Sequence, residues 1–296
     1  MESAVVFYFS GTGNTRACSR AFARSLAGRG VAVTIASIEA MDPDGAGPLI
    51  AGTDLTCFAY PVYGSEIPTP MREFMRRLPK VGDLPKVGDL PMASVPRDAA
   101  VFCTQMLYSG DGAAIADREL LPRGIKARWT AHVDMPNNVC LSAIRFPYTN
   151  DPDRIARIMR RAEAKLDRFA DAITTGREYR QGRGPLSLPL GLLQRVPFGR
   201  YEDRFRSAVS ADPSRCTSCG LCVSLCPAGN LSMDGGNVTG RGACVYCLRC
   251  YDFCPESAIM FFGKPHDPRR GAPYRGPEPG FDPACMKTHV ERFTPR

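Results

Sequence analysis

Apolar and polar positions along the first 175 residues alternate between two periods. Short apolar runs predict five strands, at Ala4–Phe9, Val31–Ile38, Leu55–Tyr60, Ala99–Thr104 and Arg128–Val133. Apolar residues at helical spacing predict helices at Thr15–Leu26, Thr69–Leu78, Gly112–Leu121 and Asp153–Ile173. Strands that alternate with helices form a parallel sheet covered on both faces, so the predicted fold class is α/β. Such sheets bind ligands beyond the carboxyl ends of their strands, and the loops there are where to look for chemistry.

Residues 176–209 form a linker of a different character. It has seven Arg and three acidic residues, and its middle, Pro185–Phe198, is apolar and interrupted by Pro. One interpretation is that the linker packs against the domains on both sides. The other is that residues 185–198 make a peripheral contact with a membrane surface or dock a partner.

Two other segments lack a clear period. The hexapeptide PKVGDL occurs twice in tandem, at Pro79–Leu84 and Pro85–Leu90. Two copies are too few for a solenoid, and the Pro and Gly in each copy indicate a duplicated surface loop. Residues 263–296 are rich in Pro and Arg and predict either an ordered wrap or a loose tail.

The cysteine content is unusual for the composition. The 296-residue chain has 13 Cys, and the sequence after Met1 has neither the basic region nor the cleavage site of a secretory signal. A disulfide framework is therefore not expected, and metal ligation or redox chemistry in the cytoplasm is the first interpretation. No apolar stretch approaches the ~20 residues of a transmembrane helix.

The formal net charge of +8 lies mainly in the linker and the tail. No helix-turn-helix signature and no stripe of basic and aromatic residues accompany it, so nucleic acid is not an expected partner. A basic surface instead suits docking of an acidic redox partner by electrostatic steering.

Eight of the cysteines form two copies of one motif. Each copy reads C-x₂-C-x₂-C-x₃-C-P, the spacing of bacterial [4Fe–4S] sites, in which the fourth Cys of each run ligates the other cluster. One cluster would then use Cys216, Cys219, Cys222 and Cys254, and the other Cys244, Cys247, Cys250 and Cys226. The alternatives are zinc sites and disulfides, but two CxxC pairs for zinc leave the third and fourth Cys of each run unexplained.

The loop after the first strand suits a phosphate group. Ser10, Gly11, Thr12, Gly13, Asn14 and Thr15 combine a Gly-rich turn, hydroxyl and amide donors, and the N-terminus of a helix. No Lys follows Gly13, which excludes a Walker A loop, and Arg16 stands where a dinucleotide fingerprint needs Gly. The neutral donors of the loop alone can hold a dianionic monophosphate.

This loop resembles the FMN phosphate loop of flavodoxins, and the resemblance covers about residues 1–175. It implies a doubly wound five-stranded parallel sheet of order 2-1-3-4-5 and FMN as cofactor. It also places two later loops beside the flavin ring, with Tyr63 and Tyr108 as stacking candidates. The FMN-contact residues so implied in these loops are Pro61, Val62, Tyr63, Gly64, Thr104, Tyr108, Ser109, Gly110, Asp111 and Gly112.

The cysteine-rich region, residues 210–262, resembles bacterial-type ferredoxins with two [4Fe–4S] clusters. The two domains in this order resemble flavodoxin–ferredoxin fusion proteins of the EFR1 type, and Asn137 belongs to a Met-Pro-x-Asn pattern similar to that group's. Outside these motifs, Cys18, Cys57, Cys103 and Cys140 are expected to be buried core residues and Cys285 a free thiol of the tail.

The leading hypothesis is an electron-transfer flavoprotein. It would pass electrons between two [4Fe–4S] clusters and FMN, to or from a protein partner such as a ferredoxin, a reductase or a low-potential oxidoreductase. The alternative is a ferredoxin-dependent FMN reductase that acts directly on a small substrate. A redox sensor is a third class, and it has less need of two clusters and a flavin.

Overall fold

A computed structural model describes residues 1–84, 97–144 and 146–295. The first PKVGDL copy, at 79–84, contains a short 3₁₀ turn at Val81–Asp83. The second copy, predicted to be part of a surface loop, lies outside the described residues.

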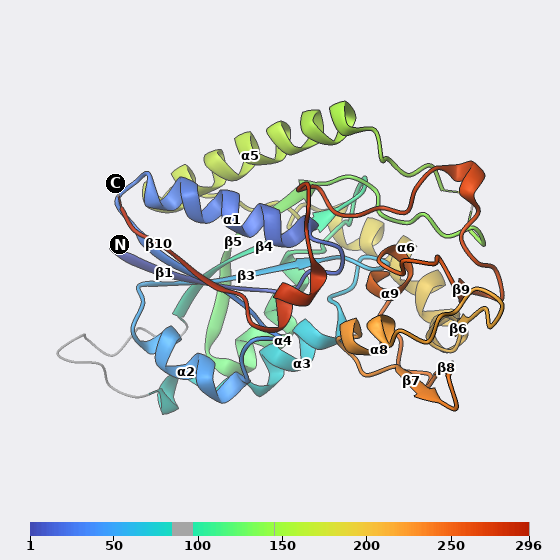
Figure 1. Cartoon of the computed structure of the whole chain (residues 1–296). Coiled ribbons are helices and arrows are strands. Elements are labelled where there is room, and N and C mark those ends of the chain that lie inside the picture. The colour runs from blue at the N-terminus through green and yellow to red at the C-terminus, as the bar shows by residue number, and fades with distance from the viewer. Residues whose placement is uncertain (85–96, 145, 296) are drawn as a thin grey trace.

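One sheet of six strands organises the larger part of the described chain (Figure 1). Its strands are β1 (Ser3–Tyr8), β2 (Ala32–Ser37), β3 (Leu55–Pro61), β4 (Arg97–Gln105), β5 (Ile125–Asp134) and β10 (Val290–Phe293). The first five are parallel in the order 2-1-3-4-5, which confirms the predicted flavodoxin-like α/β fold. The sixth strand, β10, was not predicted, and it pairs antiparallel with the free edge of β2.

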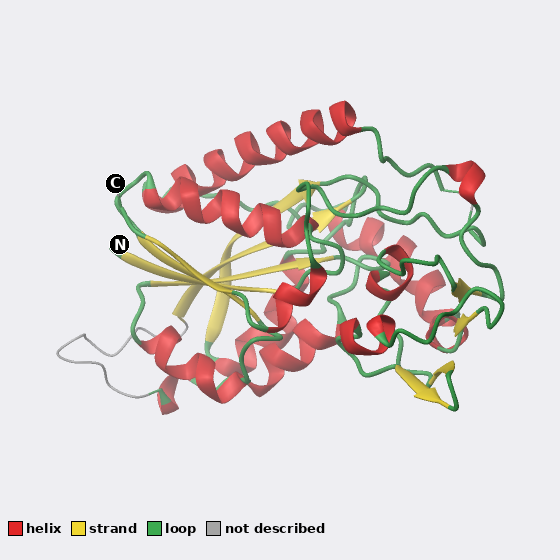
Figure 2. Ribbon diagram, viewed as in Figure 1, coloured by secondary structure: helices red, strands yellow, loops and turns green. Residues whose placement is uncertain are grey.

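Helices cover both faces of the sheet, as Figure 2 shows. On one face lie α1 (Asn14–Ala27) and α5 (Pro152–Thr174); on the other lie α2 (Pro43–Ala51), α3 (Thr69–Arg77) and α4 (Asp117–Leu120). Each face has its own apolar core. The central strand β1 is buried on both faces, which explains its unbroken apolar run.

The linker is folded over most of its length. It forms α6 (Ser187–Arg200) and α7 (Glu202–Arg206), which lead into the cysteine-rich domain. That domain is small and has its own apolar core. Its elements are β6 (Val209–Ala211), α8 (Leu221–Leu225), β7 (Leu231–Asp234), β8 (Asn237–Gly240), α9 (Arg249–Asp252) and β9 (Ile259–Phe261), with β6 paired to β9 and β7 to β8.

For the segment after residue 262, the sequence left two alternatives, an ordered wrap or a loose tail. The structure shows the ordered wrap. It runs back from the small domain, through 3₁₀ turns at Pro268–Arg270 and Pro283–Lys287, to β10 at the edge of the sheet (Figure 1, red). Glu278 forms ion pairs with Arg16 and Arg20 of α1 at 2.6 and 2.9 Å. Within the described residues, no helix is both long and apolar enough to cross a membrane.

Candidate cofactor sites

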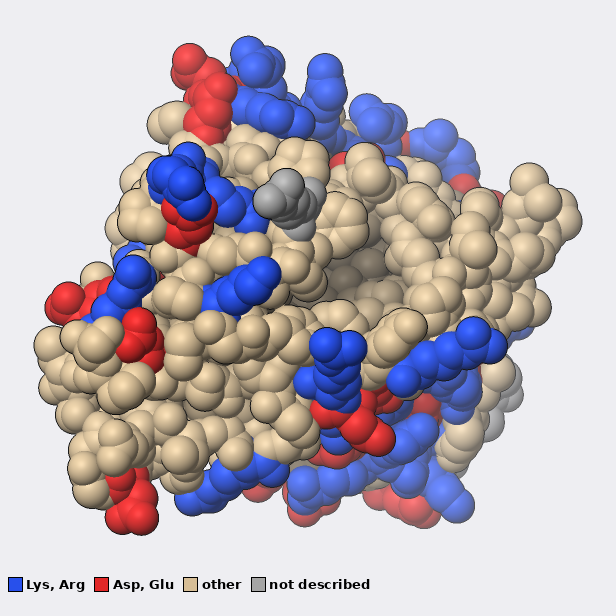
Figure 3. Space-filling model, turned by 90° about the vertical axis from the view of Figure 1, so that its right-hand side faces the viewer, with Lys and Arg blue, Asp and Glu red and all other residues tan. Residues whose placement is uncertain are grey.

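A cavity of about 570 Å³ opens beyond the carboxyl ends of the parallel strands. Figure 3 shows it as a hollow on one face of the molecule. Many of the predicted FMN-contact residues meet around it. They are Ser10, Gly11, Thr12, Asn14, Thr15, Pro61, Val62, Tyr63, Gly64, Thr104, Tyr108 and Asn137.

The loop between β1 and α1 keeps polar groups free for a ligand. Gly13 takes a positive φ of 97°, and α1 begins at the next residue, so the N–H groups of its first turn have no partner within the helix. The Ser10 hydroxyl is buried and has no hydrogen-bond partner among the described residues. A buried hydroxyl without a partner is costly, and a phosphate oxygen would satisfy it. The loop therefore fits the phosphate of FMN.

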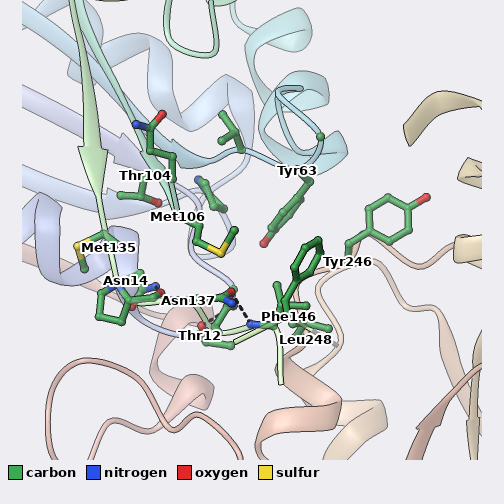
Figure 4. A pocket seen from close by; sticks show the side chains of 18 of the residues that line it. Thr12, Asn14, Tyr63, Thr104, Met106, Met135, Asn137, Phe146, Tyr246 and Leu248 are labelled. Atoms are coloured by element: carbon green, nitrogen blue, oxygen red, sulfur yellow. Dashed lines mark hydrogen bonds between the residues drawn. The ribbon is translucent and has the colours of Figure 1, made fainter. Parts of the chain in front are cut away.

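Other side chains of this loop are used to hold it in place. The hydroxyl groups of Thr15 and Thr104 are hydrogen-bonded at 2.8 Å. The Asn14 amide donates to the carbonyl of Pro136 at 2.9 Å, and the Asn138 amide donates to the Thr12 hydroxyl at 2.9 Å (Figure 4). These bonds tie the loop to β4 and to the segment after β5.

Asn137 lines the cavity, but its amide shapes the loop that it belongs to. It donates to the carbonyl of Pro147 at 2.7 Å and accepts from the N–H of Val139 at 2.9 Å. Tyr63 and Tyr246 lie on one side of the cavity, and Thr104 and Met135 on the other (Figure 4).

The structure places five of the predicted contact residues outside the lining: Gly13, Ser109, Gly110, Asp111 and Gly112. Gly13 faces the ring of Phe281, which lies 3.1 Å from the position a Cβ atom would take. The other four belong to the loop after β4, and that loop packs against α6.

Two contacts hold α6 against this loop. Arg195 of α6 donates to the Asp111 carboxylate at 2.6 Å. Gly110 has a φ of 58°, and a Cβ there would come within 2.2 Å of the Gly191 nitrogen in α6. Only a glycine permits this approach of the two backbones.

The cavity also has walls that the sequence reasoning missed. Gln194 and Phe198 come from α6, and Phe205 from α7. Tyr246, Leu248 and Phe261 come from the cysteine-rich domain. The sequence does associate the loop after β4 and the Met-Pro-x-Asn segment with the flavin, and these supply Gln105 at the end of β4, Met106, Leu107, Met135, Pro136 and Asn138. Val139, Leu141, Ile144 and Phe146, which follow that segment, were not predicted. The apolar run of the linker was the signal for the first group.

The first predicted cysteine quartet surrounds a small cavity of its own. Cys216, Cys219, Cys222 and Cys254 all line a space of about 20 Å³. Burial, with the neighbouring thiols, raises the pKa of Cys222 to about 11. Because cluster ligands bind as thiolates, loading this site must release protons.

The second predicted quartet is more deeply placed. Cys244, Cys247 and Cys250 are buried, whereas Cys219 of the first quartet is exposed. Burial raises the pKa of Cys244 to about 11 and of Cys247 to about 12, with further contributions from neighbouring thiols that include Cys226. Cys226 and Cys222 of the first motif both act electrostatically on thiols of the second motif, and the assignment of Cys226 to the second cluster stays a prediction.

The described residues contain no group of three or more His, Cys, Asp or Glu placed to hold one metal ion. The thiols of the first quartet are instead arranged around a cavity.

Arg249, between two predicted cluster ligands, joins the two domains. Its side chain is fully buried and forms a two-bond ion pair with Glu39, at 2.6 and 2.8 Å. It also donates to the carbonyls of Ser10 (2.8 Å), Gly11 (3.1 Å) and Leu225 (3.2 Å). One guanidinium thus contacts the predicted phosphate loop and the residue before Cys226.

The other cysteines of the sheet domain are buried as predicted. Burial raises the pKa of the Cys103 thiol to about 12. The thiol of Cys140 lies 2.9 Å from the Asp252 carboxylate. His132 is also buried and accepts a hydrogen bond from the N–H of Ala113 at 3.2 Å, while burial lowers its pKa to about 4.

Comparison with known proteins gives one family match and several similar solved structures. Residues 206–259 match a protein family described as a 4Fe-4S dicluster domain. Flavodoxin 2 from Bacillus cereus is 16% identical, with 59% of this chain and 99% of that chain covered and a TM-score of 0.40. A flavodoxin from the domain Archaea is 14% identical over 58% and 99%, with a TM-score of 0.37.

A third similar structure is the Flv1 flavodiiron core from Synechocystis, at 19% identity and a TM-score of 0.39. The match covers 59% of this chain and 36% of that one, so this chain spans about a third of its length. No curated protein matches. The chain thus combines a flavodoxin-like fold with a C-terminal 4Fe-4S dicluster domain, a combination that indicates a redox function in electron transfer.

Proposed function

We propose that the chain is an iron–sulfur flavoprotein of the EFR1 type that works in the cytoplasm. It passes electrons between two [4Fe–4S] clusters and one FMN, to or from a protein redox partner. The carrying observation is that one cavity is lined both by the predicted phosphate loop and by residues of the second cysteine motif.

The walls of this cavity suit FMN. The Ser10–Thr15 loop would hold the phosphate, and Tyr63 and Tyr108, which both line the cavity, would stack on the ring system. When bound, FMN supplies one- and two-electron chemistry, while each cluster carries one electron. The protein positions the group and excludes water with an apolar wall that includes Phe198 and Phe205.

The contact between the two domains supports electron exchange within the chain. Tyr246, beside Cys247, meets Tyr63 edge-to-face with ring centroids 6.5 Å apart. A Cβ at Gly11 would lie 2.5 Å from the carbonyl oxygen of Cys247, so the phosphate loop and the second motif touch. The second cluster would therefore lie next to the flavin.

The exposure of the cysteines indicates the order in which electrons pass between the partner, the two clusters and the flavin. The first quartet includes the exposed Cys219, whereas most of the second quartet is buried. The first cluster is then the exchange point for an external protein partner. The second lies between it and the flavin cavity, and the path can run in either direction.

Anaerobic purification with quantification of iron, sulfide and FMN tests this proposal. Two cubanes and one phosphate site predict about eight iron atoms and about one FMN per chain. Rapid mixing with a reduced ferredoxin should then bleach the clusters before the flavin. A preparation that binds about four iron atoms, or that binds no FMN under saturating conditions, contradicts the proposal.

A second candidate is a ferredoxin-dependent FMN reductase for a small substrate. The observation in its favour is that the cavity opens to solvent beside the exposed side chains of Met106, Leu107 and Tyr108. Turnover of a two-electron organic substrate by the holoprotein, with reduced ferredoxin as donor, would favour this candidate. Rapid reduction of protein acceptors only would favour the electron carrier.

A further inference from the structure

The helix α6 has one side that is firmly attached to the sheet domain. Arg195 donates to the Asp111 carboxylate at 2.6 Å and to the Ser65 carbonyl at 3.0 Å. Gln194 accepts a hydrogen bond from the Ser65 hydroxyl at 2.9 Å. Phe198 packs against Gly64, where a Cβ would lie 2.5 Å from its ring. These contacts fix which side of α6 faces outward.

The outward side is apolar and open to solvent. Its large side chains are between 41% and 69% exposed: Leu186, Leu188, Leu190, Leu192, Leu193 and Val196. Leu107, which is 71% exposed, extends this surface towards the cavity, because Gln194 donates to the carbonyl of the adjoining Tyr108 at 3.2 Å. We call these seven residues the leucine face. A contiguous apolar surface of this kind on a folded chain marks an interaction site.

The charges around the leucine face are mainly positive: the linker, residues 176–209, has seven Arg, and its three acidic residues are Glu178, which pairs with Arg180 at 3.0 Å, Glu202 and Asp203. From Tyr179 to Tyr201 the sequence contains four Arg and no acidic residue. Arg195 is used in the attachment of the helix, and Arg183 is paired with Asp117 at 2.5 Å. Arg200, at the end of α6, is exposed and forms no ion pair with any residue that the structure describes. Figure 3 shows Lys and Arg side chains, with Asp and Glu side chains among them, above and below the uncharged surface around the cavity.

We propose that the leucine face binds the surface of a membrane that contains anionic lipids. An exposed leucine-rich helix face in a segment with seven Arg and three acidic residues has the chemistry of an interfacial helix, which buries its apolar side among lipid headgroups. Binding in this way turns the opening of the cavity, beside Leu107, towards the lipid.

Co-sedimentation of the anaerobic holoprotein with lipid vesicles tests the proposal. We expect binding to vesicles of phosphatidylcholine with phosphatidylglycerol, and weaker binding to phosphatidylcholine alone. The double variant Leu190→Glu/Leu193→Glu should bind at least tenfold more weakly. Leu121→Glu is the matched control, because Leu121 is 49% exposed in a turn outside the leucine face, and it should bind like the wild type. Arg200→Gln should reduce only the preference for anionic vesicles.

A second measurement does not depend on the charged variants folding. Leu193→Trp adds a probe to a chain whose own Trp129 is buried. Its emission should shift to the blue on addition of anionic vesicles, while the emission of the wild type stays constant. A wild-type protein that stays in solution with both kinds of vesicle overturns the proposal and favours a protein partner for the leucine face. Equal loss of binding in the Leu121→Glu control overturns it too.

Discussion

Single cysteines distinguish the two cluster sites. The spacing of the two motifs predicts the crossed ligation scheme. In the structure, Cys254 of the second motif shares a cavity with the first three cysteines. The crossed scheme assigns the two fourth cysteines to different sites, one that includes the exposed Cys219 and one that includes the buried Cys244, Cys247 and Cys250.

Replacement of each fourth cysteine should damage a different cluster. Cys254→Ser should perturb the exposed cluster, and Cys226→Ser the cluster beside the flavin cavity. Electron paramagnetic resonance of the reduced protein can tell the two signals apart, and each variant is the control of the other. In addition, Cys226→Ser should slow reduction of the flavin, and Cys254→Ser should slow reduction of the second cluster. The first of these two effects should be the larger. Loss of the same signal in both variants would contradict the scheme.

The buried His132 gives stability a pH dependence. Its pKa is lowered to about 4 in the folded chain, against about 6.5 when unfolded, because burial disfavours the charged ring. The free energy of unfolding that this pKa difference contributes is fully present above pH 6.5. It is lost as the pH falls towards 4, at up to ~1.4 kcal/mol per pH unit. His132→Gln should therefore show a smaller fall in melting temperature between pH 7.5 and 5.5 than the wild type. Parallel curves for the two proteins would exclude His132 as the cause.

At the scale of elements, the strands were predictable and several other elements were not. Each of the first five strands was predicted within three residues of its observed bounds, because buried parallel strands have long apolar runs. The helix α2 was missed because its sequence is rich in Gly and Pro. It forms nonetheless, since Asp42 caps it by accepting from the N–H of Gly45 at 2.6 Å and Ile50 is buried in the core.

The functional loops show a different limit of sequence reasoning. The loop 109–112 has the composition of a ligand-binding loop, but it contacts α6, which comes about 80 residues later in the chain. A local pattern does not say whether a loop faces a ligand or another helix. The Ser10–Thr15 loop was easier to interpret, because the strand before it and the helix after it fix its surroundings.

The attachment of α6 should matter for FMN and not for the clusters. Asp111→Ala removes the partner of Arg195 and loosens the wall that carries Gln194 and Phe198. We expect FMN affinity, measured by fluorescence titration, to fall by about tenfold, or ~1.4 kcal/mol. Iron content should not change. Asp98→Ala, which breaks the exposed pair with Arg128, is the matched control. Equal affinities in the two variants would show that α6 is not part of the flavin site.

At the scale of the whole molecule, the two domains share their most buried ion pair. Arg249 holds carbonyl groups of the predicted phosphate loop and lies between cysteines of the second motif. A group that orders both sites couples them, and such coupling is reciprocal. Loss of the second cluster should weaken FMN binding, and loss of FMN should weaken the cluster.

Removal of the clusters by an oxidant and a chelator tests this coupling. In the wild type, we expect the FMN dissociation constant to rise about tenfold on cluster removal, a coupling of ~1.4 kcal/mol. In Arg249→Met the dissociation constant should be high with or without clusters, because the link is missing. The variant should also be less stable by ~3–5 kcal/mol, since Glu39 is left without its partner. Arg241→Met, at an exposed Arg of the same domain, should behave like the wild type. An unchanged FMN affinity in wild-type protein freed of clusters would refute the coupling.

The edge strand β10 is the last element of the chain to be synthesised. It pairs with β2, which the ribosome delivers long before it, and the cysteine-rich domain emerges between the two. During translation the edge of the sheet therefore stays open, and Phe281 has not yet covered Gly13 in the predicted phosphate loop. The last strand therefore completes a sheet whose other five strands have already been synthesised. A growing chain that stalls there would present an unpaired β2 edge to its neighbours and would be prone to aggregate.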